Sequence, residues 1–182
     1  MSAGRRTLLA AIVSASLAAL WLHLLTLQAD DTTAPGDGEP ELYIEQPQWR
    51  SFDRNGGLVR ELTAGRLEKW SGDNQARLSE PRLQLVDSRR QHWQAEARLG
   101  WLDEDSRLLR LERQVRLERE PRDNGLVVTT QTLQISERDG LIETDRAVVL
   151  ESGNWHFTAT GMRAELGRQQ LQLLGNVRGI HD

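Results

Sequence analysis

The sequence predicts an all-β, antiparallel domain that is preceded by one transmembrane helix. Three observations lead to this prediction. Residues 7–27 contain no Asp, Glu, Lys or Arg. After residue 41, short segments alternate apolar and polar side chains, which is the pattern of strands with one buried face. Glycine-containing turn signals separate these segments and favour hairpins between consecutive strands.

The apolar run of 21 residues near the N-terminus is long enough to cross a membrane. As a helix it spans about 30 Å, which is the thickness of a bilayer hydrocarbon core. Arg5 and Arg6 precede it and acidic residues follow it, so the positive-inside rule places the N-terminus in the cytoplasm. A cleaved signal peptide and a twin-arginine export signal remain as alternatives. The candidate cleavage site after Ala29 has Leu27 where a small residue is needed, and this favours a retained helix.

An acidic segment with Pro and Gly follows the predicted helix and has the composition of a linker. The residues after it are enough for one domain of ordinary size. The predicted organisation is a cytoplasmic N-terminus (1–6), a transmembrane helix (7–27), a linker (28–41) and a β domain (42–182).

Composition and motifs argue against catalysis and nucleic-acid binding. The chain has 23 basic and 27 acidic residues, and no basic stripe offers a site for phosphate backbones. It has no cysteine, which excludes thiolate metal sites and cysteine nucleophiles. The four histidines show no zinc-binding spacing, and no nucleophile elbow or phosphate-binding loop occurs. We therefore predict no enzyme, no metal and no cofactor, and interpret the acidic run 103–105 as a hairpin turn rather than a calcium loop.

Turn signals divide the alternating segments at regular intervals. They are Asn55-Gly56-Gly57, Ser71-Gly72-Asp73-Asn74, Asn124-Gly125, Asp139-Gly140, Ser152-Gly153-Asn154 and Gly167. Asn-Gly and Asp-Gly adopt the positive φ angles that tight hairpins require. This spacing predicts an antiparallel meander.

The segments also form an internal repeat. Leu83, Val115, Val148 and Val177 occupy similar short apolar cores and are 32, 33 and 29 residues apart. Each core follows a segment that is rich in Ala and Thr. The repeat therefore predicts a strand–turn–strand unit that occurs about four times and stacks into an elongated pair of sheets with one continuous apolar face.

The predicted anchor and linker are followed by a fixed order of segments, which are 42–49, 62–67, 78–85, 93–96, 143–145, 160–166 and 171–178. The order and spacing of these segments resemble the LptC family, the single-pass periplasmic component of lipopolysaccharide export. The resemblance covers essentially the whole chain, and Gly65-Arg66 departs from it where an acidic residue is expected.

This resemblance implies a β-jellyroll of OstA-like repeats, a V-shaped pair of sheets around an apolar groove. It also implies an inner-membrane protein with most of its chain in the periplasm and no enzymatic activity. Members of the family receive lipopolysaccharide from the inner-membrane ABC transporter LptB2FG and pass it to periplasmic LptA. The anchor associates with LptF and LptG, the N-terminal edge strand pairs with LptF, and the C-terminal edge strand pairs with LptA.

A lipid carrier must shield acyl chains from water, because exposing a chain of about 14 carbons costs about 10 kcal/mol. The predicted groove residues are Leu83, Leu85, Trp93, Ala95, Val115, Leu117, Leu133, Ile135, Val148, Leu150, Phe157, Leu171 and Leu173. The predicted partner-edge residues are Tyr43, Ile44, Trp49, Gly161, Asn176, Val177 and Arg178. The same apolar residues would form a closed core in an anchored tether that binds partners but no lipid, and the sequence leaves that alternative open.

Overall fold

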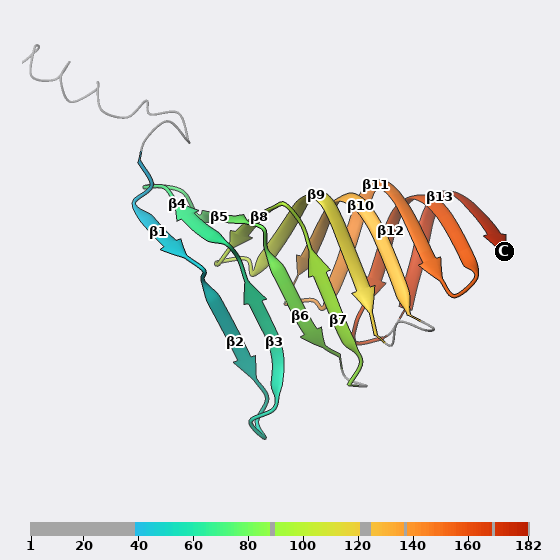
Figure 1. Cartoon of the computed structure of the whole chain (residues 1–182), viewed down its shortest axis with the longest axis horizontal. Coiled ribbons are helices and arrows are strands. Elements are labelled where there is room, and N and C mark those ends of the chain that lie inside the picture. Colours follow the sequence, from blue (N-terminus) through green and yellow to red (C-terminus); the bar gives the residue numbers. More distant parts are fainter. Residues whose placement is uncertain (1–38, 88–89, 121–124, 137, 169, 182) are drawn as a thin grey trace, which may run out of the picture. The chain divides into compact units, whose positions relative to one another are not determined.

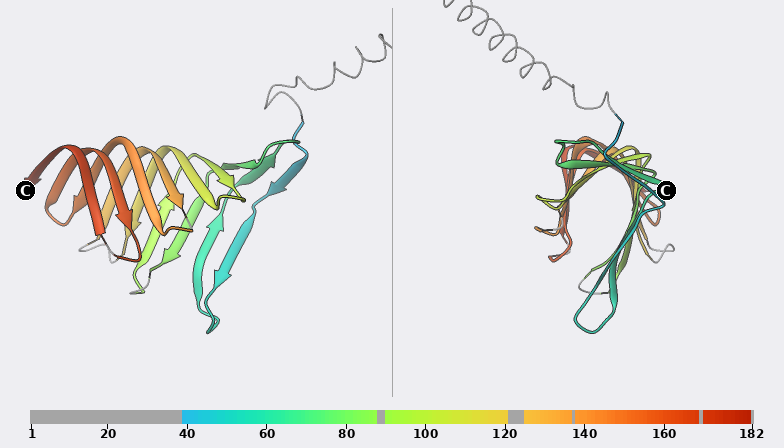
Figure 2. Two further views of the ribbon diagram at one scale, coloured as in Figure 1. Left: turned by 180° about the vertical axis from the view of Figure 1, so that it is seen from behind. Right: turned by 90° about the vertical axis from the view of Figure 1, so that its left-hand side faces the viewer.

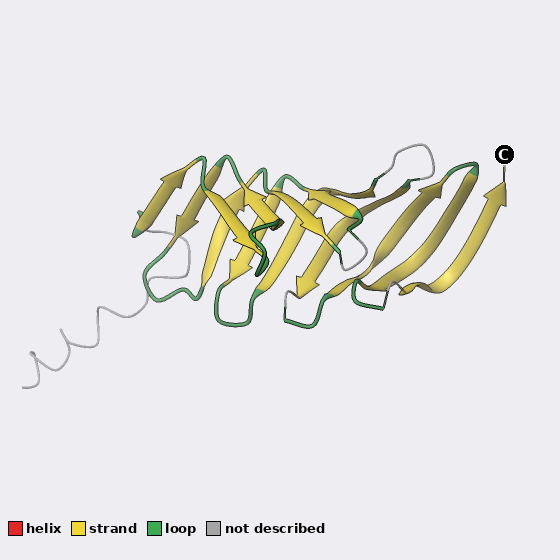
Figure 3. Cartoon of the chain, turned by 90° about the horizontal axis from the view of Figure 1, so that it is seen from below, coloured by secondary structure: helices red, strands yellow, loops and turns green. Residues whose placement is uncertain are grey.

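The computed structural model describes residues 39–87, 90–120, 125–136, 138–168 and 170–181. From Pro40 onward these residues form one compact unit made of strands (Figures 1 and 3). The strands are β1 (Leu42–Glu45), β2 (Gln48–Phe52), β3 (Leu58–Thr63), β4 (Arg66–Lys69), β5 (Gln75–Ser79), β6 (Arg82–Val86), β7 (His92–Glu96), β8 (Leu99–Asp103), β9 (Leu108–Arg119), β10 (Leu126–Ser136), β11 (Leu141–Ser152), β12 (Trp155–Glu165) and β13 (Gln170–His181).

The predicted transmembrane helix at 7–27 and most of the predicted linker lie outside the described residues. In the part of the chain that is described, no helix has the length and apolar character needed to span a bilayer.

All thirteen strands of the described residues belong to one antiparallel sheet. The eight short strands form four composite strands (β1–β2, β3–β4, β5–β6 and β7–β8), each interrupted by only two residues. With β9 to β13 they make nine long strands, and each long strand pairs with the ones before and after it in the chain. The predicted all-β antiparallel class is therefore confirmed.

Every long strand bends near its middle, and the bends form a crease across the sheet. In the first half of the sheet the crease runs through Gln46, Gly65, Glu80 and Arg98, which are joined by backbone hydrogen bonds. Gln46 N donates to Gly65 O at 3.0 Å, Gly65 N to Ser79 O at 2.8 Å, and Glu80 N to Arg98 O at 3.0 Å. The sheet is therefore continuous across the bend.

Left-handed backbone conformations and β-bulges produce the crease. Gln46, Glu80, Arg113 and Asn176 have φ angles of 50°, 51°, 65° and 52°. A bulge or left-handed residue rotates the strand direction locally and increases the twist. In the second half of the sheet, register shifts lie at the same level, for example between Thr130 and Gln134.

Two buried threonines form hydrogen bonds with backbone groups that lie beside these bulges. Thr130 Oγ1 donates to the carbonyl oxygen of Ala147 at 2.9 Å. Thr144 Oγ1 accepts a hydrogen bond from the backbone N–H of Arg146 at 3.1 Å. Buried polar groups are costly without partners, and these hydrogen bonds explain why two threonines are tolerated in an otherwise apolar interior.

The crease divides the sheet into two half-sheets. Half-sheet A contains β2, β3, β6, β7 and residues 115–119, 126–130, 147–152, 155–160 and 177–181. Half-sheet B contains β1, β4, β5, β8 and residues 108–112, 132–136, 141–144, 162–165 and 170–175. Seen along the domain, the strands curve into an arch (Figure 2). The predicted pair of sheets is thus one folded sheet.

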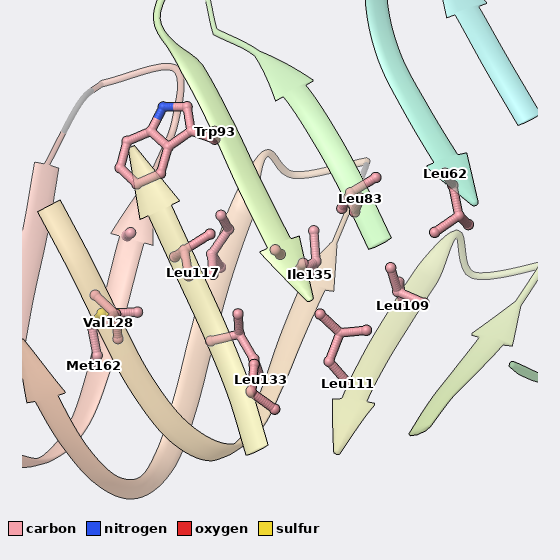
Figure 4. Close-up of a cluster of buried hydrophobic side chains, with 14 of the residues drawn as sticks. Leu62, Leu83, Trp93, Leu109, Leu111, Leu117, Val128, Leu133, Ile135 and Met162 are labelled. Atoms are coloured by element: carbon pink, nitrogen blue, oxygen red, sulfur yellow. The ribbon is translucent and has the colours of Figure 1, made fainter. Parts of the chain in front are cut away.

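The apolar core lies between the two half-sheets. Leu62, Leu83 and Leu117 come from half-sheet A, and Leu111 and Leu133 come from half-sheet B; Figure 4 shows them in one cluster. The central long strands bury alternate residues, as β9 does with Leu109, Leu111, Val115 and Leu117 on the same face on both sides of the bend, whereas edge strand β1 is fully exposed.

The predicted repeat and its turns agree with this topology. Four strand–turn–strand units follow the first long strand, and Leu83, Val115, Val148 and Val177 each lie on the second strand of a unit. The turn signals at Gly56, Gly72, Gly140, Gly153 and Gly167 fall between long strands, while Asn124 lies outside the described residues. The acidic run 103–105 begins the turn between β8 and β9, as predicted.

Candidate functional site

Two cavities lie between the half-sheets on the side away from the crease. The larger, which we call the C-terminal cavity, has a volume of about 630 Å³. Its walls are the outer ends of β7, β9, β10 and β11 and the start of β12 on half-sheet A, and the end of β12 and the start of β13 on half-sheet B. The lining residues are Asp87, Gln91, Trp93, Arg119, Leu126, Leu150, Ser152, Phe157, Ala164, Glu165, Leu166, Gln170, Leu171 and Leu173.

The second, the N-terminal cavity, has a volume of about 420 Å³. Leu166 lines both cavities, so they lie side by side along the open side of the folded sheet. The lining residues are Trp49, Arg50, Ser51, Arg60, Leu62, Leu83, Leu85, Leu102, Asp103, Glu104, Arg107, Leu109, Ile135, Ser136, Gly140 and Leu166. Both volumes are in the range of small-molecule sites, and a mostly apolar wall with a few polar groups is typical of such sites.

Aromatic side chains form much of one wall of the C-terminal cavity. Trp93 Nε1 donates to Asp87 Oδ2 at 3.3 Å, and the Arg119 guanidinium lies 5.5 Å from the Trp93 ring centroid. Phe157 stacks on Trp155 with their ring centroids 5.6 Å apart. The hydrogen bond satisfies the indole N–H, so its apolar face can border the cavity at low cost.

Charged groups gather around the N-terminal cavity. Arg60 Nη2 donates to Ser51 Oγ at 3.2 Å, and Arg50 forms an ion pair of 2.7 Å with Glu61. The backbone N–H of Ser106 donates to Asp103 Oδ1 at 2.9 Å. This hydrogen bond lowers the pKa of Asp103 from its ordinary value, so its carboxylate is charged at neutral pH.

The thirteen predicted groove residues all belong to the apolar interior, but they divide into three groups. Trp93, Leu150, Phe157, Leu171 and Leu173 line the C-terminal cavity. Leu83, Leu85 and Ile135 line the N-terminal cavity. Ala95, Val115, Leu117, Leu133 and Val148 line neither cavity and are buried in the packed core. The open space is therefore at the outer ends of the strands, where the two half-sheets diverge.

Within the described residues, most of the predicted partner-edge residues lie on strands that have a free edge. Tyr43 and Ile44 are exposed on β1, and Asn176, Val177 and Arg178 are exposed on β13. The Tyr43 hydroxyl donates to Glu45 Oε1 at 3.0 Å, and this hydrogen bond raises the Tyr43 pKa.

Two of these residues are placed differently from the expectation. Gly161 lies on β12, which is paired on both sides by β11 and β13, so it is not at an edge. Its φ angle is +89°, and a Cβ atom there would lie 3.1 Å from the Thr144 carbonyl oxygen, so it is needed for the bulge. Trp49 is on edge strand β2, but its side chain packs against the core and lines the N-terminal cavity.

Several cavity residues did not stand out in the sequence. Leu126 and Leu166 lie at strand ends next to turns, where alternation is hard to read from a short segment. Arg60, Arg107 and Arg119 are three of 23 basic residues in the sequence, and no motif marks them. A signal existed for Arg60 and Arg119, because each is two residues from a buried leucine on its strand and so shares its face.

The arrangement offers an apolar cleft with polar and charged groups in its lining. Within the described residues, no group of three or more His, Asp or Glu side chains could hold a metal ion.

Comparisons with known proteins agree with this arrangement. A family model described as "Lipopolysaccharide-assembly, LptC-related" matches residues 7–182. Among nine similar chains of solved structures is LptH from Pseudomonas aeruginosa, described as the LptA homologous periplasmic component of the conserved lipopolysaccharide transport device. The match covers 75% of this chain and 96% of that chain, with a TM-score of 0.52 and 9% identity, and thus shows a common fold. No curated protein matches.

Proposed function

The chain belongs to the LptC family of lipopolysaccharide-assembly proteins, and from this premise we propose that it carries lipopolysaccharide between the inner-membrane transporter LptB2FG and periplasmic LptA. The family gives it a role in lipopolysaccharide transport, and its relatives are transport components, not known enzymes. The proposal adds the direction of transfer, the cavities as the path of the acyl chains, and a periplasmic β domain attached to the inner membrane by the predicted helix at 7–27.

The observation that carries the proposal is the pair of adjoining apolar cavities along the open side of the folded sheet. Acyl chains that enter them leave water while the sugar head group stays outside. Each buried methylene contributes about 0.8 kcal/mol, so even partial insertion of several chains supplies substantial binding free energy. Widening of the angle between the half-sheets would extend this space into the present core.

The free edges support the proposed partners. Among the described residues, every large exposed apolar side chain lies at one of the two ends of the sheet. They are Leu42, Tyr43, Ile44, Phe52 and Leu58 at the N-terminal end, and Trp155, Leu174, Val177 and Ile180 at the C-terminal end. Unpaired strands favour association by strand addition. We assign β13 to LptA, β1 to LptF, and the predicted membrane helix to LptF and LptG.

Photo-crosslinking tests the lipid path. A photoreactive amino acid in place of Trp93 or Phe157 is expected to crosslink to lipopolysaccharide when the full chain is present with the working transporter. The same group at Phe52, which is 59% exposed and lines neither cavity, is expected to give little product. A tether that binds partners but no lipid would give no crosslink at any of these positions, and this result would exclude the carrier function.

Substitution at the C-terminal edge tests the assignment to LptA. We expect Val177→Glu to weaken LptA binding by about tenfold, because Val177 is half exposed on β13 and a charge there opposes apolar strand pairing. The matched change Ile44→Glu, on exposed β1, should leave LptA binding unchanged and reduce association with LptF. Binding of purified proteins in solution measures both effects. Equal loss of LptA binding in the two variants would contradict the assignment of edges.

A further inference from the structure

We propose that Arg60 and Arg107 bind a phosphate group on the lipid head group at the mouth of the N-terminal cavity. This inference rests on the proposed function, because it requires that acyl chains occupy the adjoining apolar space. It adds a binding site for the anionic head group of the lipid, and it places this head group at the N-terminal cavity.

Arg60 lies on the inner face of half-sheet A. It is two residues before buried Leu62 on β3 and therefore shares its face. Its strand partners are Ser51 on β2 and Leu85 on β6, both of which also line the N-terminal cavity. A half-buried cation thus lies in the wall of the cavity beside apolar residues.

Arg107 approaches the same cavity from half-sheet B. It is in the turn between β8 and β9, with a φ angle of +53°, and it lines the cavity together with Leu102 and Leu109. The two arginines therefore come from opposite walls of one cavity. A guanidinium group offers several donors in a planar array that matches phosphate oxygens, and two such groups can share one phosphate.

Two acidic residues, Asp103 and Glu104, also line this cavity. Asp103 accepts the Ser106 N–H, and Glu104 lies 3.9 Å from Lys69 Nζ. The lining contains three arginines, of which Arg50 is paired with Glu61, against two acids, whereas the C-terminal cavity contains one arginine against two acids. Charge complementarity therefore favours an anionic head group at the N-terminal cavity over the C-terminal one.

The apolar interior distinguishes a lipid phosphate from a free phosphate. Leu62, Leu83, Leu85, Leu109 and Ile135 line the same cavity as the two arginines, so the site combines an apolar wall with cationic groups. An amphiphile satisfies both features, while inorganic phosphate satisfies only one. The occupant is therefore a phosphorylated lipid.

The test compares diphosphoryl lipid A with its fully dephosphorylated derivative, using the full chain. The unmodified protein is expected to bind the phosphorylated lipid about tenfold more tightly, with an affinity that falls as salt rises. The double variant Arg60→Gln, Arg107→Gln should lose this preference and keep its affinity for the dephosphorylated lipid. Arg54→Gln, on the exposed β2–β3 turn outside both cavities, should behave like the unmodified chain.

Each other outcome has a defined meaning. Equal affinity of the unmodified protein for the two lipids would overturn the head-group site while leaving the carrier function intact. Failure of both lipids to bind would overturn the proposed function and the site with it. Competition by inorganic phosphate at concentrations comparable to the lipid would assign the arginines to a free anion and also overturn the site. Retained affinity of the double variant for the dephosphorylated lipid shows that the variant is folded.

Discussion

The variant Leu171→Glu is expected to bind lipopolysaccharide at least about 30-fold more weakly than the unmodified chain, a loss of about 2 kcal/mol. Leu171 is half-buried on β13, packs against the core and lines the C-terminal cavity. The substitution removes apolar contact area from the cavity and places a carboxylate where an acyl chain would lie. Titration of the purified chain with lipopolysaccharide measures the change.

The same strand provides the matched control for this variant. Leu174 is 50% exposed and lines neither cavity, so Leu174→Glu introduces the same charge three residues away without entering the cleft. It is expected to change lipopolysaccharide affinity by less than about threefold. Circular dichroism should show that both variants are folded. Similar affinities for the two variants would mean that the C-terminal cavity is not part of the lipid path.

The variant Leu111→Ala is expected to lower the free energy of unfolding by about 2–5 kcal/mol, because truncation of a fully buried leucine loses transfer free energy and leaves a cavity. Leu111 is 0% exposed, on half-sheet B close to the crease. Its strand neighbours on the two sides are Gly100 and Leu133, so the wall around it comes from three adjacent long strands. Denaturant unfolding of the purified chain measures the loss.

An exposed leucine serves as the control for stability. Leu42 is 44% exposed on edge strand β1, and Leu42→Ala should cost less than about 1 kcal/mol. A small effect of Leu111→Ala, comparable with that of Leu42→Ala, would show that the two half-sheets are not held together by this core. The folded sheet would then be stabilised mainly by its backbone ladder.

Residue alternation predicted the strands correctly because a half-buried sheet imposes a period of two on its sequence. Of the four predicted repeat positions, Leu83, Val115 and Val148 are buried between the half-sheets, whereas Val177 is 50% exposed on edge strand β13. The tight turns at Gly56 and Gly153 were also predictable, because both adopt positive φ angles that favour glycine.

The bends in the long strands were not predictable in the same way. Gln46, Glu80, Arg113 and Asn176 take left-handed conformations, yet most of these residue types have no strong preference for them. Pro47 and Pro81 follow two of the bends, and Arg113 is followed by glutamine. Each bend depends on the neighbouring strands. Adjacent long strands must bend at the same level so that both half-sheets can cover one core.

The sequence by itself determined the all-β class, the antiparallel order, the repeated unit and the apolar set that forms the interior, because these follow from local period and turn chemistry. Only the tertiary structure decided which members of that set line a cavity and which fill the core. Whether an apolar residue fills the core or lines a cavity depends on its distance from the crease. Near the crease the half-sheets are close enough for leucines to interdigitate, and at the outer strand ends the half-sheets diverge and leave the cavities. The tertiary structure likewise brought Arg60 and Arg107, 47 positions apart in the chain, into the lining of one cavity.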